Sequence, residues 1–267
     1  MKKIAIIAGG GNLPKIVFNS LKERGIEVLI IGIKNNYKYK NLNKDTLEVK
    51  LGSLNLIFKI LKNNKIKNII FAGSIKRPTL KDLSLDFKAI EFLRKNRIEN
   101  LGDDKLLKSI SNYFENNGFR FIKWNKYCPN LFSTSKFLTI KKPTKIAYEN
   151  LEKGIKIFKY FGKSDVGQSM IIQNKIILGL EAIEGTNNLI KRCYNYKRKG
   201  DLGILLKLKK FKQDERFDLP AIGVNTIKLL HKYKYEGIFI QNKYCLIIDK
   251  EKVIDLANRY NLFISCI

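Results

Sequence analysis

Apolar and polar residues form two different patterns along the first half of the chain: continuous apolar runs and apolar residues at helical spacing. Residues 4–7 form a continuous apolar run, which is typical of a buried strand, and residues 15–22 carry apolar side chains at helical spacing. The same reading predicts strands over 27–33, 68–72 and 118–124, and helices over 54–63, 85–93 and 105–116. Strands that alternate with helices through short glycine turns favour an open, mostly parallel α/β sheet.

The pattern changes near residue 130. Residues 130–145 show little periodicity and predict a connector. Beyond it the pattern predicts a helix over 147–161, short strands over 169–173, 175–180, 203–207, 237–240 and 244–248, and a closing helix over 252–260. Asn242-Lys243 predicts a hairpin turn between the last two strands. We therefore predict an α/β domain over 1–130, a linker over 131–145 and a second α/β domain over 146–267.

Composition narrows the classes of function. The 267 residues suffice for two domains of ordinary size, and no run approaches the roughly 18 apolar residues of a transmembrane helix. Met1-Lys2-Lys3 precedes only a short apolar run, which predicts a first strand and no signal peptide. The four cysteines are far apart and predict free thiols in a reducing cytoplasm, with no disulfide framework and no zinc site.

The net charge of +28 raises the question of nucleic-acid binding. Lysine dominates over arginine, and the lysines are spread along nearly the whole chain. A dedicated nucleic-acid protein more often concentrates arginine and aromatic residues on one element, so we expect no dedicated nucleic-acid partner. The charge still favours anionic ligands and anionic membrane surfaces.

A glycine-rich turn joins the first predicted strand to the first helix. Such a turn lets the backbone approach a ligand closely, and the helix N-terminus offers N–H groups to a phosphate. Gly9 and Gly11 fit the dinucleotide fingerprint G-x-G-x-x-G, but Pro14 occupies the place of its third glycine. A nucleotide or nucleotide sugar is therefore favoured over NAD(P), and a plain tight turn is the alternative. The candidate binding residues are Gly9, Gly10, Gly11, Asn12, Leu13 and Pro14.

An acidic motif, "QDERFDLPAIGVNT", lies in the second half. Asp214, Arg216 and Asp218 occupy alternate positions, so in an extended segment their side chains point the same way. Two carboxylates that flank an arginine can hold a divalent cation and clamp a phosphate. A solvated loop with an internal ion pair is the alternative. The turn that Pro220 and Gly223 predict favours the catalytic interpretation.

Other polar residues follow predicted strands or begin predicted helices. Asp103 and Asp104 start a helix, where they cap it or bind a metal. The single histidine, His231, lies beside lysines on a helix and supports no catalytic triad. Further candidates for substrate contacts are Lys76, Arg77, Gln168, Glu184, Gly185 and Thr186. Ordinary surface charge and turn formation are the alternative explanations for these residues.

Seven motifs resemble, in order and spacing, the LpxI-type UDP-2,3-diacylglucosamine pyrophosphatases of lipid A biosynthesis. They are "IAGGGNLP", "GSLNLIFKILK", "FAGSIKRP", "GDDKLLKSI", "DVGQSMIIQ", "EAIEGTN" and "FDLPAIGVNT", and they span nearly the whole chain. The resemblance implies a Rossmann-like N-terminal domain followed by a second α/β domain. It also implies hydrolysis of UDP-2,3-diacylglucosamine to UMP and 2,3-diacylglucosamine 1-phosphate (lipid X). Mg²⁺ is the expected cofactor, with Mn²⁺ as the alternative, and water attack on the sugar-side (β) phosphorus is favoured.

The resemblance also assigns roles to residues. It implies that Asp218 is the essential carboxylate, with Asp214 as the close alternative. The candidate metal ligands are Asp218, Asp214, Asp103 and Asp104. Asn187 follows "EGT" where an aspartate is expected, which puts a metal ligand there in doubt. The implied location is the cytoplasm, peripheral at the cytoplasmic face of the inner membrane, and a homo-oligomer is left open.

Two other classes of protein explain less. An NAD(P)-dependent oxidoreductase calls for an acidic residue that closes the second strand, and that strand ends at Ile33 followed by Lys34. A non-enzymatic basic nucleotide-binding module leaves the carboxylate motifs unexplained.

Overall fold

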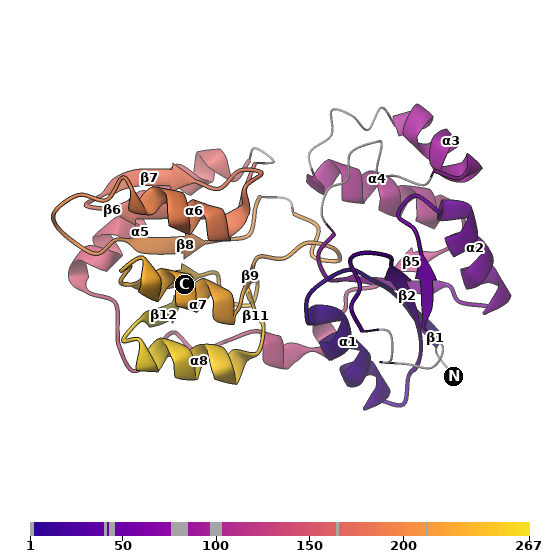
Figure 1. Ribbon diagram of the computed structural model, residues 1–267, viewed down its shortest axis with the longest axis horizontal. Coiled ribbons are helices and arrows are strands. Elements are labelled where there is room, and N and C mark those ends of the chain that lie inside the picture. The colour runs from indigo at the N-terminus through magenta and orange to yellow at the C-terminus, as the bar shows by residue number, and fades with distance from the viewer. Residues whose placement is uncertain are drawn as a thin grey trace. The chain divides into compact units, whose positions relative to one another are not determined.

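The chain forms two compact units in the computed structural model (Figure 1). The structure describes residues 3–39, 42, 46–75, 85–96, 103–163, 166–211 and 213–267. One unit consists of Met1–Pro129 with Asp214–Asp218, and the other of Asn130–Gln213 with Leu219–Ile267. We call them the N-terminal and C-terminal units. Each contains a sheet flanked by helices, which confirms the predicted α/β fold class.

The N-terminal unit is built on a parallel five-stranded sheet. Its strand order is β3-β2-β1-β4-β5. This order matches the first five strands of doubly wound dinucleotide-binding folds, in which ligands bind beyond the carboxyl ends of the strands where the order reverses. Here that point lies between β1 and β4. The strands are β1 (Lys3–Ala8), β2 (Glu27–Ile33), β3 (Leu47–Val49), β4 (Asn68–Ala72) and β5 (Arg120–Phe121).

Helices cover both faces of this sheet. The odd-numbered side chains of β1, such as Ala5 and Ile7, pack with α2 and α4 around a cluster of phenylalanines, while α1 contacts β1, β2 and β4. The helices are α1 (Leu13–Lys22), α2 (Leu54–Asn63), α3 (Phe87–Asn96) and α4 (Asp103–Asn116), close to their predicted bounds. The strand predicted over 118–124 is shorter, because the chain turns into the 3₁₀ helix η3 (Asn125–Tyr127) soon after β5.

The C-terminal unit has a mixed five-stranded sheet of order β12-β10-β8-β6-β7. Strands β12, β10 and β8 are parallel, and β6 is antiparallel to both of its neighbours. The carboxyl ends of β7 and β8 therefore share one edge of the sheet with the start of β6. The strands are β6 (Ser169–Gln173), β7 (Ile176–Leu180), β8 (Ile204–Lys207), β10 (Gly237–Ile240) and β12 (Phe263–Cys266).

Helices bury both faces of the second sheet (Figure 1). Helix α5 covers one face, where Leu151 and Phe158 pack on Met170 and Leu206, and helices α6, α7 and α8 cover the opposite face.

No helix in the described part of the chain is long and apolar enough to cross a bilayer. The remaining elements are α5 (Lys145–Phe161), α6 (Gly185–Tyr194), α7 (Val224–Lys232), α8 (Lys250–Arg259), η4 (Pro129–Leu131) and the short parallel pair β9 (Ala221–Ile222) and β11 (Leu246–Ile247).

The hairpin predicted at Asn242-Lys243 is wrong. Strand β10 already has parallel neighbours on both sides, β8 and β12, so the chain that leaves it must turn away from the sheet. It does so at Gln241, whose carbonyl accepts hydrogen bonds from the N–H groups of Tyr244 and Cys245, and then forms β11 beside β9.

The segment predicted as a linker contacts the second sheet. Within it, the Lys136 carbonyl accepts a hydrogen bond from the Cys266 N–H (2.8 Å), and the Leu138 N–H donates to the Ile264 carbonyl (3.0 Å). The segment therefore runs along β12 and belongs to the C-terminal unit from Asn130 onward. Its lack of periodicity reflects an irregular backbone that is nevertheless hydrogen-bonded.

Candidate functional site

The loops that follow β1 and β4 are hydrogen-bonded to each other. The Gly10 N–H donates to the Ser74 carbonyl (2.7 Å), and the Ser74 N–H donates back to the Gly10 carbonyl (3.0 Å). A Cβ on Gly9 would lie 2.5 Å from the Ser74 carbonyl oxygen, and a Cβ on Gly73 would lie 2.5 Å from that of Gly10. Gly9 and Gly73 are therefore required by the contact between the two loops, whether or not a ligand binds.

Gly11 differs from Gly9 and Gly73. It is exposed, its φ is +81°, and a Cβ there would meet nothing within 4 Å. Asn12 follows at the N-cap position of α1 and accepts a hydrogen bond from the Tyr39 hydroxyl (2.5 Å), while Pro14 is buried in the first turn. Gly11 is thus the glycine of this loop that faces open space, and it lies at the N-terminus of α1, where N–H groups favour an anion.

The other predicted residues of the N-terminal half are placed only in part. Lys76 and Arg77 lie outside the described residues. Asp103 and Asp104 begin α4, but their side chains are also outside the described part. The predicted roles of these four residues in binding an anion or a metal stay predictions.

The segment Asp214–Asp218 adopts a turn, so the extended conformation predicted for it is wrong. The Asp214 carbonyl accepts hydrogen bonds from the N–H groups of Phe217 (3.2 Å) and Asp218 (3.3 Å). The Arg216 N–H also donates to Asp214 Oδ1 (3.0 Å), a short-range contact that favours a turn over a strand. Although it lies in the second half of the sequence, this segment packs with the N-terminal unit.

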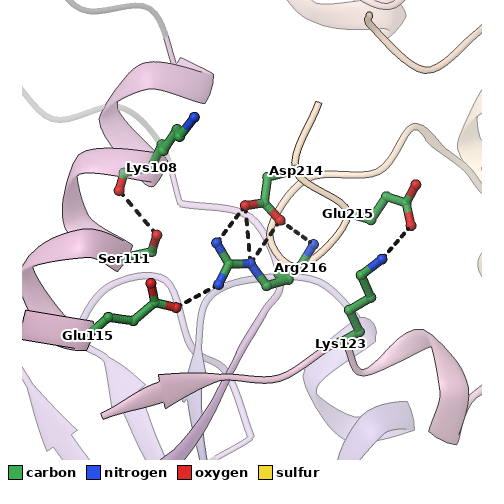
Figure 2. Close-up of polar contacts among 7 residues, drawn as sticks. All are labelled: Lys108, Ser111, Glu115, Lys123, Asp214, Glu215 and Arg216. Atoms are coloured by element: carbon green, nitrogen blue, oxygen red, sulfur yellow. Dashed lines mark hydrogen bonds and ion pairs between the residues drawn. The ribbon is translucent and has the colours of Figure 1, made fainter. Parts of the chain in front are cut away.

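Arg216 joins two carboxylates (Figure 2). Its Nε and one terminal nitrogen donate to both oxygens of Asp214, at 2.7–3.1 Å. Its other terminal nitrogen donates to Glu115 Oε1 on α4, at 2.6 Å. Burial by itself would raise the pKa of Asp214, but the hydrogen bonds and charge of Arg216 outweigh it and hold that pKa below its ordinary value. Both carboxylate oxygens of Asp214 therefore already accept hydrogen bonds from Arg216.

This geometry bears on the predicted metal site. A metal ion at Asp214 would have to compete with the guanidinium for both oxygens, so Asp214 does not fit a ligand role in this arrangement. Among the described residues there is no group of three or more His, Cys, Asp or Glu side chains that could hold a metal ion. The prediction of a metal site therefore rests on Asp218, which is half-buried at the end of the turn, and on Asp103 and Asp104, whose side chains lie outside the described part.

The C-terminal unit contains a second polar cluster, at the shared edge of β6, β7 and β8. Thr186, in the first turn of α6, donates to Glu181 Oε1 (2.7 Å) and accepts from the Lys207 ammonium (2.6 Å). The Gln168 N–H donates to Glu181 Oε2 (3.1 Å), and the Ser169 hydroxyl lies 3.3 Å from that of Thr186. The structure thus brings the backbone of Gln168 and the side chain of Thr186, two predicted substrate contacts, to the same carboxylate, Glu181.

Lys207, like Glu181 and Ser169, is a member of this cluster that is not among the site residues predicted from the sequence. It ends the apolar strand β8 and is only 6% exposed. Burial of a lysine is rare without a partner, and Thr186 and the charge of Glu181 provide one. A charged residue that closes a run of buried aliphatic side chains was the available signal, and in a lysine-rich chain it does not stand out.

The remaining two predicted contacts belong to the start of α6. Glu184 accepts hydrogen bonds from Arg192 (2.7 and 3.0 Å) and from the Ala182 N–H (3.1 Å), so its carboxylate stabilises the helix that it precedes. Gly185 has a φ of +75°, which favours glycine there. Their roles as substrate contacts stay predictions.

Glu181 makes the cluster sensitive to acid. Burial alone would raise its pKa, but the charge of Lys207 and hydrogen bonds from its neighbours lower that pKa below the ordinary value. A lowered pKa means that the ionised carboxylate stabilises the fold above about pH 4.5 and that this contribution is lost as the pH falls further.

We therefore expect Glu181→Gln to lower the free energy of unfolding by about 3 kcal/mol at pH 7, since it leaves the buried Lys207 without its counter-charge. The difference from wild type should shrink as the pH falls from 5 to 3. Urea unfolding at several pH values measures this, with exposed Glu152→Gln on α5 as the control. A difference that stays constant down to pH 3 contradicts the assignment.

Comparison with known proteins identifies the family. The model of the LpxI N-terminal domain matches residues 3–131, and that of the LpxI C-terminal domain matches residues 134–265. The UDP-2,3-diacylglucosamine pyrophosphatase LpxI of Caulobacter vibrioides (strain ATCC 19089 / CIP 103742 / CB 15) is 27% identical over 272 residues, which cover 99% of this chain and 97% of that protein. Both domains match in chain order and almost without a gap. The chain belongs to the LpxI family, as its motifs predicted.

Proposed function

We propose that this protein hydrolyses the pyrophosphate bond of UDP-2,3-diacylglucosamine, giving UMP and 2,3-diacylglucosamine 1-phosphate (lipid X). The observation that carries the proposal is the match of both LpxI domains along nearly the whole chain, together with the substrate in the name of the Caulobacter relative. The N-terminus of α1 beside the exposed Gly11 supports the proposal, because unpaired N–H groups at a helix N-terminus favour a phosphate.

Asp218 is the carboxylate that we assign to the chemistry. It lies at the end of the turn whose other acid, Asp214, is committed to Arg216. A carboxylate in this position accepts a proton from the attacking water or binds a metal ion. We assign the attack to the β phosphorus. Gly11, Asn12 and Leu13 then receive the anionic diphosphate, and Gln168, Glu184, Gly185 and Thr186 remain proposed substrate contacts.

The proposed cofactor is Mg²⁺, with Mn²⁺ as the alternative. A bound divalent ion neutralises charge on a phosphoryl oxygen and lowers the pKa of a coordinated water. Asp218 would hold it, together with Asp103 and Asp104.

Exhaustive chelation with EDTA should therefore abolish the release of UMP, and added Mg²⁺ or Mn²⁺ should restore it. The midpoint of thermal unfolding, measured in the same buffers, controls for an effect of the chelator on folding. Full activity of a metal-stripped sample would rule out the metal.

The direct test of the proposed function is incubation of the purified protein with UDP-2,3-diacylglucosamine and Mg²⁺. We expect UMP and lipid X in equal amounts, and much slower release of UMP from UDP-N-acetylglucosamine, which lacks the two acyl chains. Oxidation of NADH or NADPH by the protein would instead favour the oxidoreductase alternative. Intact UDP-2,3-diacylglucosamine after prolonged incubation would refute the proposal.

We also propose that the protein works at the cytoplasmic face of the inner membrane. A diacylated substrate resides in a membrane, and the net charge of +28 favours an anionic lipid surface. Binding to vesicles that contain anionic lipid should weaken as the salt concentration rises.

A further inference from the structure

Neighbouring side chains fix the segment that carries Asp218 to the N-terminal unit. Glu215 pairs with Lys123 (3.1 Å), whose side chain is 55% exposed, and the next two residues make the other contacts. We propose that Glu115, Arg216 and Phe217 form an anchor that positions Asp218. Arg216 contributes its hydrogen bond to Glu115, and Phe217 packs into the aromatic core. Glu115, Arg216 and Phe217 are then positioning residues, and the inference rests on the role proposed above for Asp218.

The polar half of the anchor is the contact between Arg216 and α4 (Figure 2). The 2.6 Å hydrogen bond to Glu115 joins residues that are 101 positions apart in the sequence. The Arg216 side chain is 25% exposed and the Glu115 side chain 35%, so the pair is partly shielded from water. A guanidinium that holds two carboxylates at once fixes the direction of the turn more firmly than a single exposed ion pair.

The apolar half of the anchor is Phe217. Its ring centroid lies 5.6 Å from that of Phe71 in β4 and 5.1 Å from that of Phe121 in β5. Phe217 thus packs against the same core cluster that joins the sheet to α2 and α4. The Arg216 guanidinium carbon lies 4.8 Å from the centre of the Phe217 ring, so the two halves of the anchor also contact each other.

Asp218 follows this anchor directly. Its N–H is hydrogen-bonded to the Asp214 carbonyl, and Asp214 is held by Arg216. The turn that carries Asp218 is therefore closed by its own hydrogen bonds, and Arg216 and Phe217 hold it against α4, β4 and β5. For the role of a phosphate clamp, which the sequence suggested, Arg216 would have only the N–H groups left over from its hydrogen bonds to Asp214 and Glu115. Its contacts favour a positioning role.

Glu115→Gln tests the anchor with little change in shape. The control is Glu149→Gln in the C-terminal unit, where the ion pair with Lys175 has a similar length of 2.7 Å and the Glu149 side chain is 34% exposed. Hydrogen exchange is followed on peptides that cover residues 213–219, and kcat and KM are measured with UDP-2,3-diacylglucosamine. Arg216→Lys and the double variant with Glu115→Gln complete a cycle.

We expect Glu115→Gln to speed exchange of the 213–219 amides about three- to tenfold, with exchange in β1 and β4 unchanged. A small displacement of a catalytic group is costly, so kcat should fall about tenfold while KM stays within about twofold. The double variant should resemble Arg216→Lys alone, because both changes break the same contact. The Glu149→Gln control should match wild type in exchange and in kcat.

Unchanged exchange in Glu115→Gln would overturn the anchor. Faster exchange with an unchanged kcat would overturn its positioning role. Effects on kcat that multiply in the double variant, or that follow only the folded fraction measured by circular dichroism, would show a general structural role and overturn the proposal as well. A wild type that leaves the substrate intact would instead refute the proposed function, and the exchange data would then decide on the anchor alone.

Discussion

Asp218→Ala is expected to lower kcat by roughly three orders of magnitude or more, with the fold and substrate binding retained. A general base contributes about 10²–10⁴-fold, and a lost metal ligand removes charge neutralisation in addition. Asp218→Asn should be nearly as inactive, because the amide keeps the shape but has neither the charge nor the proton affinity. The measurements are kcat from UMP release, the Kd for substrate, and the circular dichroism spectrum.

The matched control for these variants is Asp255→Asn, which changes an exposed aspartate on α8 and should leave kcat unchanged. If Asp218→Asn retains more than about a tenth of the wild-type kcat, far more than loss of a base allows, Asp218 is not the catalytic carboxylate. Asp214 is then the next residue to replace, and the interpretation of its contacts with Arg216 changes with it.

Gly11→Asn is expected to raise KM for UDP-2,3-diacylglucosamine about tenfold or more, which corresponds to a loss of about 1.4 kcal/mol of binding. Asparagine tolerates a positive φ better than other side chains, so the fold should survive. Its side chain would occupy the open space at the α1 N-terminus where we place the diphosphate. Initial rates over a range of substrate concentrations separate KM from kcat.

Gly118→Asn is the control for this substitution. Gly118 is also exposed, has a φ of +87° and has nothing within 4 Å of its missing Cβ, but it precedes β5 at the amino edge of the sheet. Its replacement should cost a similar small amount of stability and leave KM unchanged. Equal KM values for the two variants and wild type would mean that the loop is a turn without a ligand.

Much of the fold follows from hydrophobic periodicity, because buried strands and amphipathic helices carry strong local patterns. Strand β2 and helix α2 have the predicted bounds. Short strands were missed, among them β3, which has three residues and only one buried, and the edge strand β12, although its four residues are buried. The hairpin at Asn242-Lys243 failed for a different reason. Turn residues show that the chain turns, whereas the pairing of β10 with β8 and β12 depends on the rest of the sheet.

The geometry of the acidic motif could not be predicted from the sequence. Alternate spacing suggested that Asp214, Arg216 and Asp218 face one way in a strand. Instead, backbone hydrogen bonds to Asp214 close the segment into a turn, and Arg216 contacts Glu115 on α4. Glu115 belongs to a helix about a hundred residues earlier, so nothing local in the sequence points to it. The same holds for Lys207, whose importance becomes visible only when β8 and α6 are brought together.

The most direct measurement of the central claim is hydrolysis of UDP-2,3-diacylglucosamine by the purified protein in water enriched in ¹⁸O. The reaction consumes one water for each pyrophosphate bond that breaks, so one product must gain one labelled oxygen on its phosphate. We predict label in 2,3-diacylglucosamine 1-phosphate and none in UMP, with no turnover by Asp218→Asn. Label in UMP would contradict attack at the β phosphorus, and an absence of hydrolysis by the wild type would contradict the account as a whole.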